Sequence, residues 1–118
     1  MPVKFRVKRI YDAASDGDGF RILVDRLWPR GVTKAAAKID LWAKEAAPST
    51  ELRKWFHEDP ARLSKFVDKY LHELDERRNE IEVIFKKIDR PIISLLTATK
   101  DPQAGHVPAL KKFLRSLL

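Results

Sequence analysis

The stretch from Val24 to Gly31, which reads VDRLWPRG, limits the folds open to this chain more than any other. It continues an apolar run, so residues 20–27 are expected to form a buried strand that is β-branched and apolar at its centre. Pro29 lacks a backbone N–H and biases Trp28 toward an extended conformation, so the strand is expected to end near Trp28. Gly31 then allows the positive φ that a Pro-x-Gly turn often needs. The sequence therefore predicts a buried strand that ends in a charged turn.

Four side chains leave the carboxyl end of this strand together. They are Asp25, Arg26, Trp28 and Arg30. In open α/β sheets, ligands bind at that edge. The alternative interpretation is a strand end with solvated charges and a tryptophan packed as a lid on the core, since structural ion pairs are common.

Three further stretches have the patterns of strands. Residues 4–10 alternate charged and apolar side chains, which predicts a strand near a sheet edge. Residues 91–97 are an apolar run that opens on a proline, which predicts a buried strand. Residues 39–46 favour a short strand or extended segment, with an alanine-rich helix as the alternative.

Helices are indicated by capping residues and by apolar side chains at steps of three and four. Ser49 is a natural N-cap, and Asp59-Pro60 begins the clearest helical stripe of the chain. A polar run at residues 75–80 predicts a break in that stripe. The predicted helices cover residues 33–38, 50–57, 63–74, 81–88 and 103–118.

The order of these elements predicts a single compact α/β domain over residues 1–118, with a small, mostly parallel central sheet of about four strands flanked by helices. A chain of 118 residues, 44% of them hydrophobic, can bury one core of that size. The loop at residues 11–19 is short for a helical crossover. The first two strands are therefore expected to be either an antiparallel pair or joined by an irregular parallel crossover.

The formal charge of +7 lies mainly in two segments. Residues 1–34 carry a net +4 and residues 91–118 a net +3, which suggests a basic face for a partner that bears phosphate or carboxylate groups. The charge can also serve solubility alone. The chain has no cysteine and no apolar run long enough for a membrane span or a signal peptide, so we expect a cytoplasmic protein without a membrane partner.

Two unusual runs, VDRLWPRG and the APS-x-ELRKWF run at residues 47–56, make this chain resemble the YeaO-like family of bacterial and archaeal proteins, a domain of unknown function. The resemblance extends over nearly the whole chain and implies a small α/β fold with no established reaction. The chain departs from the family pattern at Gly105 and Val107, where the family tends to have Asn and Ala around the histidine that is His106 here. Further matching residues are Arg9 to Asp12, Lys34, Asp40, Trp42, Lys44, Glu45, Asp59, Pro60, Lys100 and Asp101.

If the strands that end near Arg26 and Thr97 are parallel neighbours, eight candidate side chains converge on one sheet edge. They are Asp25, Arg26, Trp28, Arg30, Lys44, Thr99, Lys100 and His106. Arginine forks bind planar oxyanions, helix N-termini donate N–H groups, and tryptophan can stack on a base or a guanidinium. In the alternative interpretation, Asp25 and Glu45 neutralise these cations in structural pairs.

The expected roles follow from side-chain chemistry. Arg26, Arg30 and Lys100 are predicted to hold the anion, and Asp25 to orient an arginine. His106 is the candidate for proton transfer if a reaction occurs, with a structural helix cap as the alternative.

The leading hypothesis is a binding protein or small enzyme for a phosphorylated or nucleotide-like anionic ligand, with the reaction left open. The alternatives are a nucleic-acid-binding module that uses the basic terminal segments, and an interaction domain without a ligand. Neither His57-Glu58-Asp59 nor His72-Glu73 has H-E-x-x-H spacing, so no metal site is expected, and no cofactor motif is present.

Overall fold

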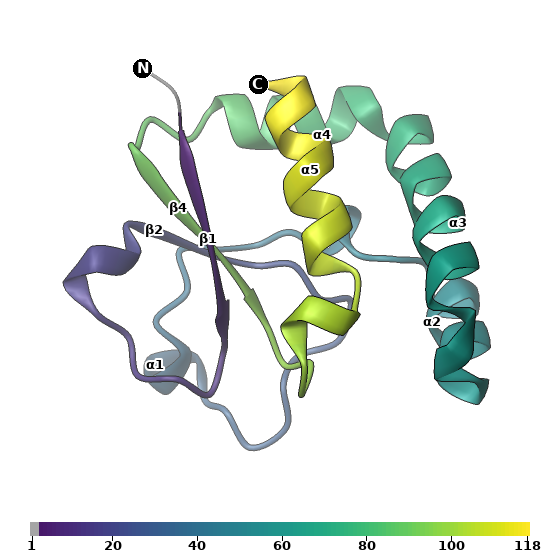
Figure 1. Cartoon of the computed structure of the whole chain (residues 1–118). Coiled ribbons are helices and arrows are strands. Elements are labelled where there is room, and N and C mark those ends of the chain that lie inside the picture. Colours follow the sequence, from purple (N-terminus) through teal and green to yellow (C-terminus); the bar gives the residue numbers. More distant parts are fainter. Residues whose placement is uncertain (1–2) are drawn as a thin grey trace.

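Four strands form one sheet in the order β1-β4-β2-β3, and every neighbouring pair is parallel (Figure 1). The computed structural model describes residues 3–118, so residues 1 and 2 of the predicted domain lie outside the described part. The strands are β1 (Lys4–Arg9), β2 (Phe20–Leu23), β3 (Leu41–Trp42) and β4 (Ile92–Thr97). The predicted α/β class is confirmed, and the first two strands prove to be parallel to each other with β4 between them.

The described chain contains five α-helices. They are α1 (Lys34–Ala37), α2 (Thr50–Glu58), α3 (Leu63–Glu76), α4 (Arg78–Lys86) and α5 (Val107–Leu117). The Ser49 hydroxyl accepts a hydrogen bond from the backbone N–H of Leu52, as expected of an N-cap. The predicted break between residues 75 and 80 falls at Arg77, where α3 ends and α4 begins.

The two faces of the sheet are covered differently. Alternation along β2 directs Ile22 to one face and Arg21 and Leu23 to the other. The first face packs against α2 to α5 in the main hydrophobic core, and the second packs against α1 in a smaller cluster around Leu23 and Leu96. Figure 1 shows α3, α4 and α5 gathered on one side of the sheet, with α1 apart from them.

The prediction that the strand continues to residue 27 is wrong, because β2 ends at Leu23. The N–H of Val24 still donates a hydrogen bond to the carbonyl of Leu96 at 3.0 Å. The carboxylate of the next residue, Asp25, turns toward the end of β4, and the chain makes no further strand pairing there. The predicted turn is present, with Gly31 at a φ of 72°. The charged side chains therefore project from a loop rather than from a strand end.

Two other segments also differ from the expected elements. The last helix begins at Val107 and not at residue 103, because a separate 3₁₀ turn at Pro102–Ala104 is followed by an extended Gly105. Residues 39–46 divide into the two-residue strand β3 and a 3₁₀ turn at Lys44–Ala46. Both differences produce short turns near the carboxyl edge of the sheet.

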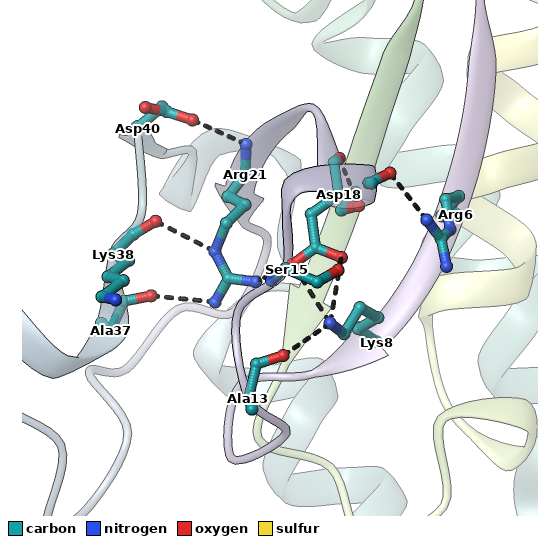
Figure 2. A network of polar contacts seen from close by, with 11 residues as sticks. Arg6, Lys8, Ala13, Ser15, Asp18, Arg21, Ala37, Lys38 and Asp40 are labelled. Carbon is teal, nitrogen blue, oxygen red and sulfur yellow. Dashed lines mark hydrogen bonds and ion pairs between the residues drawn. The ribbon is translucent and has the colours of Figure 1, made fainter.

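At the other end of β2, Asp18 is fully buried in a network of polar contacts (Figure 2). Its carboxylate lies 3.0 Å from Lys8 Nζ and 2.5 Å from Arg21 Nη1, and it also accepts hydrogen bonds from Ser15. Arg21 in turn donates to the carbonyls of Ala37 and Lys38 at the end of α1. Burial alone would raise the pKa of Asp18, but the Ser15, Lys8 and Arg21 hydrogen bonds outweigh it and hold that pKa well below its usual value.

Gly19 explains how the chain passes from this network into β2. Its φ is 64°, and a Cβ at this position would lie 2.2 Å from the carbonyl oxygen of Ile92. Only glycine combines that conformation with so close an approach to β4. The tight contact brings the Asp18 carbonyl to the Ser94 hydroxyl, which donates to it at 2.6 Å.

Candidate functional site

A cleft of about 390 Å³ lies at the carboxyl edge of the sheet, beyond the ends of β2 and β4. The loop after β2, helix α2, the start of α3 and the loop after β4 all contribute to its walls. Its polar lining includes Asp25, Arg26, Arg30, Arg53, His57, Thr99 and His106. Its apolar lining includes Leu27, Trp28, Pro29, Pro48, Phe56 and Phe66.

Asp25 anchors the loop after β2 to the end of β4. One carboxylate oxygen accepts from the Thr97 hydroxyl at 2.7 Å, and the other accepts from the backbone N–H of Ala98 at 2.7 Å. Burial would raise the pKa of Asp25, but His106 and these two donors lower it overall. Asp25 is therefore an ionised group whose oxygens are already engaged by the protein.

His106 stands next to this carboxylate, just before α5. Its Nε2 lies 2.9 Å from the carbonyl oxygen of Val24 and 3.3 Å from Asp25 Oδ1. Both neighbours are acceptors, so Nε2 carries a hydrogen. The ring of Tyr70 packs edge-on against the imidazole, with 5.8 Å between the ring centres.

Tyr70 fixes the position of the segment that precedes α2. Its hydroxyl donates to the carbonyl of Ala46, and burial raises the pKa of Tyr70 well above its usual value of 10. Glu73 on the same helix accepts from both the backbone N–H and the hydroxyl of Ser49, at 2.9 and 2.6 Å. Helix α3 thus holds both sides of the Ala47-Pro48 segment.

Arg26 reaches that segment from the cleft. Its Nε donates to the carbonyl of Pro48 at 2.9 Å, and its Nη2 lies 3.4 Å from the carbonyl of Ala47. These carbonyls bear no formal charge, so the positive charge of Arg26 is oriented but not neutralised. Within residues 3–118 it forms no ion pair.

Arg30 and Arg53 have even fewer partners. Both line the cleft, Arg30 exposed and Arg53 half-buried. Across the described residues, neither guanidinium group has a hydrogen bond or an ion pair, although the backbone carbonyl of Arg30 accepts from the Tyr11 hydroxyl at 3.3 Å. The cleft therefore presents two guanidinium groups that have no partner in the described chain, beside the oriented but unneutralised Arg26.

Aromatic rings form the apolar part of the cleft. Phe56 stacks on Phe66 with 4.2 Å between ring centres and an interplanar angle of 17°. Trp28 lines the cleft, while its indole N–H donates to the carbonyl of Val32 at 2.6 Å and its ring meets Trp42 edge-on. Trp28 therefore fits both predictions made for it, because it lines the cleft as a site residue would and also packs on the smaller core as a lid would.

The structure brings six of the eight predicted site residues together. Asp25, Arg26, Trp28, Arg30, Thr99 and His106 all line the cleft. Lys44 is exposed and places its Nζ 4.1 Å from the ring centre of Trp42, and Lys100 is exposed outside the lining.

The predicted partners of the two acidic residues are not observed. Asp25 contacts Thr97, Ala98 and His106 and does not orient an arginine. Neither Asp25 nor Glu45 neutralises a cleft arginine within residues 3–118. The alternative of structural ion pairs therefore does not describe this cleft.

Sequence reasoning missed the contribution of α2. In the sequence, Arg53 and Phe56 stand out only as members of the APS-x-ELRKWF run, and His57 was considered only as a metal ligand. All three line the cleft. They stand at positions i, i+3 and i+4, which share one face of a helix, and that spacing was the available signal.

No group of three or more potential metal-ligating His, Asp or Glu side chains is found in residues 3–118. None of the helices in this part of the chain is long and apolar enough to cross a membrane.

Comparison with known proteins gives matches along nearly the full length. A family model described as the inactive DUF488-N3 subclade matches residues 4–118. The uncharacterized protein YeaO of Escherichia coli K12 is 41% identical over 115 residues, which is 98% of this chain and 100% of that protein. The uncharacterized protein Rv3073c of Mycobacterium tuberculosis H37Rv is 36% identical over 111 residues, 94% of this chain and 93% of that protein. No solved structure gives a significant match.

Proposed function

Since the chain belongs to the YeaO-like family, within the inactive DUF488-N3 subclade, we propose that it binds a small phosphorylated or nucleotide-like anion in the cleft at the carboxyl edge of its sheet. One observation carries the proposal. Arg30 and Arg53 line this cleft without any hydrogen bond or ion pair from their guanidinium groups to residues 3–118.

The charge balance of the cleft supports an anionic ligand. Among residues 3–118, Asp25 is its only acidic lining residue, and that carboxylate already accepts from Thr97, Ala98 and His106. Arginine binds phosphate and carboxylate groups bidentately, and a cleft lined by one sign of charge concentrates ions of the opposite sign. A phosphoryl group would supply the counter-charge that the protein itself does not provide.

The shape and apolar walls of the cleft support a ligand with an organic part. A volume of about 390 Å³ falls within the range of about 300 to 1,000 Å³ that is usual for small-molecule sites. Phe56, Phe66 and Trp28 offer aromatic surface for a base or another planar group. An interaction domain without a ligand would not need both features in one cleft.

Binding without turnover is the form of this proposal that we favour. The description of the family as inactive supports it. Among the described residues no serine lines the cleft, the chain has no cysteine, and Asp25 is occupied by hydrogen bonds. The cleft therefore offers recognition groups without a serine or cysteine nucleophile in that part of the chain.

The nucleic-acid alternative predicts a different response to salt. Contacts made by basic charge alone weaken steeply as salt rises and have no sequence preference. We expect only such weak binding to duplex and single-stranded DNA, measured by fluorescence anisotropy at increasing salt. Tight binding that survives high salt would favour the nucleic-acid module over the small-ligand site.

Thermal unfolding with a panel of anions tests the proposal. The panel holds inorganic phosphate, pyrophosphate and nucleoside 5′-mono- and diphosphates. A ligand present at about 100 times its dissociation constant stabilises the protein by about 2.7 kcal/mol, which for a domain of this size raises Tm by about 10 °C. We expect at least one of these anions to give a saturable rise.

Matched variants locate the effect. Arg30→Gln and Arg53→Gln remove a charge inside the cleft, and Lys100→Gln removes the same charge from an exposed residue outside it. The two cleft variants should lose most of the rise in Tm, while Lys100→Gln should keep it. The proposal fails if no anion stabilises the protein, or if all three variants lose the effect equally.

A further inference from the structure

The imidazole of His106 has one nitrogen committed to the protein and one that is not. Nε2 lies between the carbonyl oxygen of Val24 and the carboxylate of Asp25, and it donates its hydrogen to them. Asp25 is in turn fixed by Thr97 and Ala98 at the end of β4. The ring is therefore held in one orientation, and any change of protonation must occur at Nδ1.

Nδ1 is the ring nitrogen that remains available to a ligand. It has no hydrogen-bond partner in residues 3–118, whereas every buried side-chain nitrogen or oxygen in that part of the chain has one. Nδ1 is consequently not sealed from solvent, although His106 as a whole is only 8% exposed. The cleft is the surface to which His106 contributes.

We propose that His106 is a specificity-determining residue that takes up one proton at Nδ1 when a doubly charged phosphoryl group binds, and then donates that hydrogen to a phosphoryl oxygen. The proton comes from solvent, and no covalent bond forms or breaks. This inference rests on the proposed function and names the charge state of the ligand.

His106 can attract an oxyanion through Nδ1 only if Nδ1 is protonated. With Nε2 protonated, a neutral imidazole directs the lone pair of Nδ1 into the cleft, where it repels an oxyanion. A protonated ring offers a charge-assisted donor at the same place. Asp25 stabilises that imidazolium through Nε2, and its lowered pKa keeps it ionised for this role.

The neighbouring charges favour uptake only when the ligand is present. Arg26 and Arg30 from the loop after β2, and Arg53 from α2, keep the empty cleft positive and oppose a further cation. Tyr70 on α3 packs against the ring and remains neutral because its pKa is raised. A dianion reverses this balance, so binding and protonation should be coupled.

His57 is the competing group. It also lines the cleft, but it is exposed at the end of α2 and makes no contact with Asp25 in the described chain. This makes His57 the natural control for His106.

Isothermal titration calorimetry with sulfate measures the proton directly. Sulfate stays a dianion between pH 5.5 and 8.5, so any proton taken up must go to the protein. In buffers of different ionisation enthalpy at pH 8, the wild type should take up about one proton, and its affinity should fall up to about tenfold per pH unit. His106→Gln should show no uptake and flat pH dependence, while His57→Gln should still take up the proton, whatever its effect on affinity. Inorganic phosphate, measured in parallel, should follow the same order.

A second measurement keeps the test valid if His106→Gln folds poorly. Nitrogen-15 NMR of the wild-type imidazoles during the sulfate titration should show Nδ1 of His106 changing to its protonated state. The inference is overturned if sulfate binds without proton uptake, or if His57→Gln and not His106→Gln removes the uptake. Absence of sulfate and phosphate binding even at pH 5.5 would also overturn the inference, whereas the proposed function fails only if pyrophosphate and the nucleoside phosphates do not stabilise the protein either.

Discussion

Asp18 and Asp25 stand two residues before and two residues after β2, and they show two different uses of a carboxylate in the same fold. Both have a lowered pKa because hydrogen bonds outweigh burial. The cations around Asp18 have partners within the protein, since Lys8 and Arg21 contact the carboxylate and also donate hydrogen bonds to backbone carbonyls (Figure 2). Asp25, by contrast, forms no ion pair with the cleft arginines Arg26, Arg30 and Arg53 in the described chain.

This difference separates structural charge from functional charge. A buried cation that spends all its donors inside the protein stabilises the fold and leaves nothing for a ligand. A cation beside a cleft with no internal partner contributes little to stability and remains available for binding. We call the amino end of β2 closed, because its cations have partners within the protein, and its carboxyl end open, because its arginines remain available to a ligand.

The largest expected effect is at the closed end. Asp18→Asn leaves Lys8 and Arg21, which is only 5% exposed, without their counter-charge, and should lower the free energy of unfolding by about 3 to 5 kcal/mol. Urea denaturation, with midpoint and slope compared, measures this loss. Asp16→Asn, an exposed residue in the same turn, is the control and should change the free energy of unfolding by less than about 0.5 kcal/mol. Equal effects of the two changes would contradict the closed description.

Acid should reduce the contributions of both Asp18 and Asp25 to the free energy of unfolding. A carboxylate whose pKa is lower in the folded than in the unfolded protein stabilises the fold above its usual pKa, and this stabilisation is lost progressively as pH falls from that value through the lowered pKa of the folded state. We therefore expect the free energy of unfolding to decline below about pH 5 and to continue declining below pH 4. The Asp18→Asn variant should decline less, because it lacks one of the two groups. A wild-type stability that does not change between pH 5 and pH 3 would show that these hydrogen bonds are not maintained in solution.

Asp25→Asn should cost less than Asp18→Asn. The amide must turn an N–H₂ group toward either Ala98 or His106, so one hydrogen bond to the original carboxylate is lost, at about 2 kcal/mol. The Asp25 side chain is 15% exposed at the cleft, so water can replace part of this loss. Urea denaturation of both variants under one set of conditions gives the ranking, and a larger loss for Asp25→Asn would reverse our comparison.

The smallest effect on stability is expected for Arg30→Ala. The side chain is exposed and has no ion pair in the described chain, so the free energy of unfolding should stay within about 0.5 kcal/mol of the wild type. Retention of the anion that stabilises the wild type should nevertheless fall. A loss of several kcal/mol would mean that Arg30 is structural, and the ligand-site interpretation of VDRLWPRG would have to be withdrawn.

Much of the fold was predictable because local rules and burial agreed. Ser49 and the apolar stripe of α3 identified their helices, and the apolar run before Thr97 identified β4. The end of β2 was not predictable in the same way. Pro29 marks where a strand must stop at the latest, but the strand stops earlier because Asp25 bonds to residues more than seventy positions away.

The candidate site was predictable where its residues follow strand ends, and less so elsewhere. Asp25 and His106 could be placed at one edge by assuming that β2 and β4 are parallel neighbours, and they are. The part played by Arg53 depends on how α2 packs over that edge, which no local pattern encodes. Lys44 was misleading because it lies two residues after β3, yet its side chain stacks on Trp42.

The position of β4 in the sheet has a consequence for how the protein folds. β4 contacts both β1 and β2, but it is made near the end of the chain, and β1 and β2 do not pair with each other. During synthesis β1 must therefore remain without a partner strand until β4, more than eighty residues later in the sequence, has left the ribosome. Such long-range pairing slows folding and exposes strand edges to other chains in the meantime. The charged side chains Lys4, Arg6 and Lys8 on β1 would discourage intermolecular pairing during that interval, before they have any role in the finished protein.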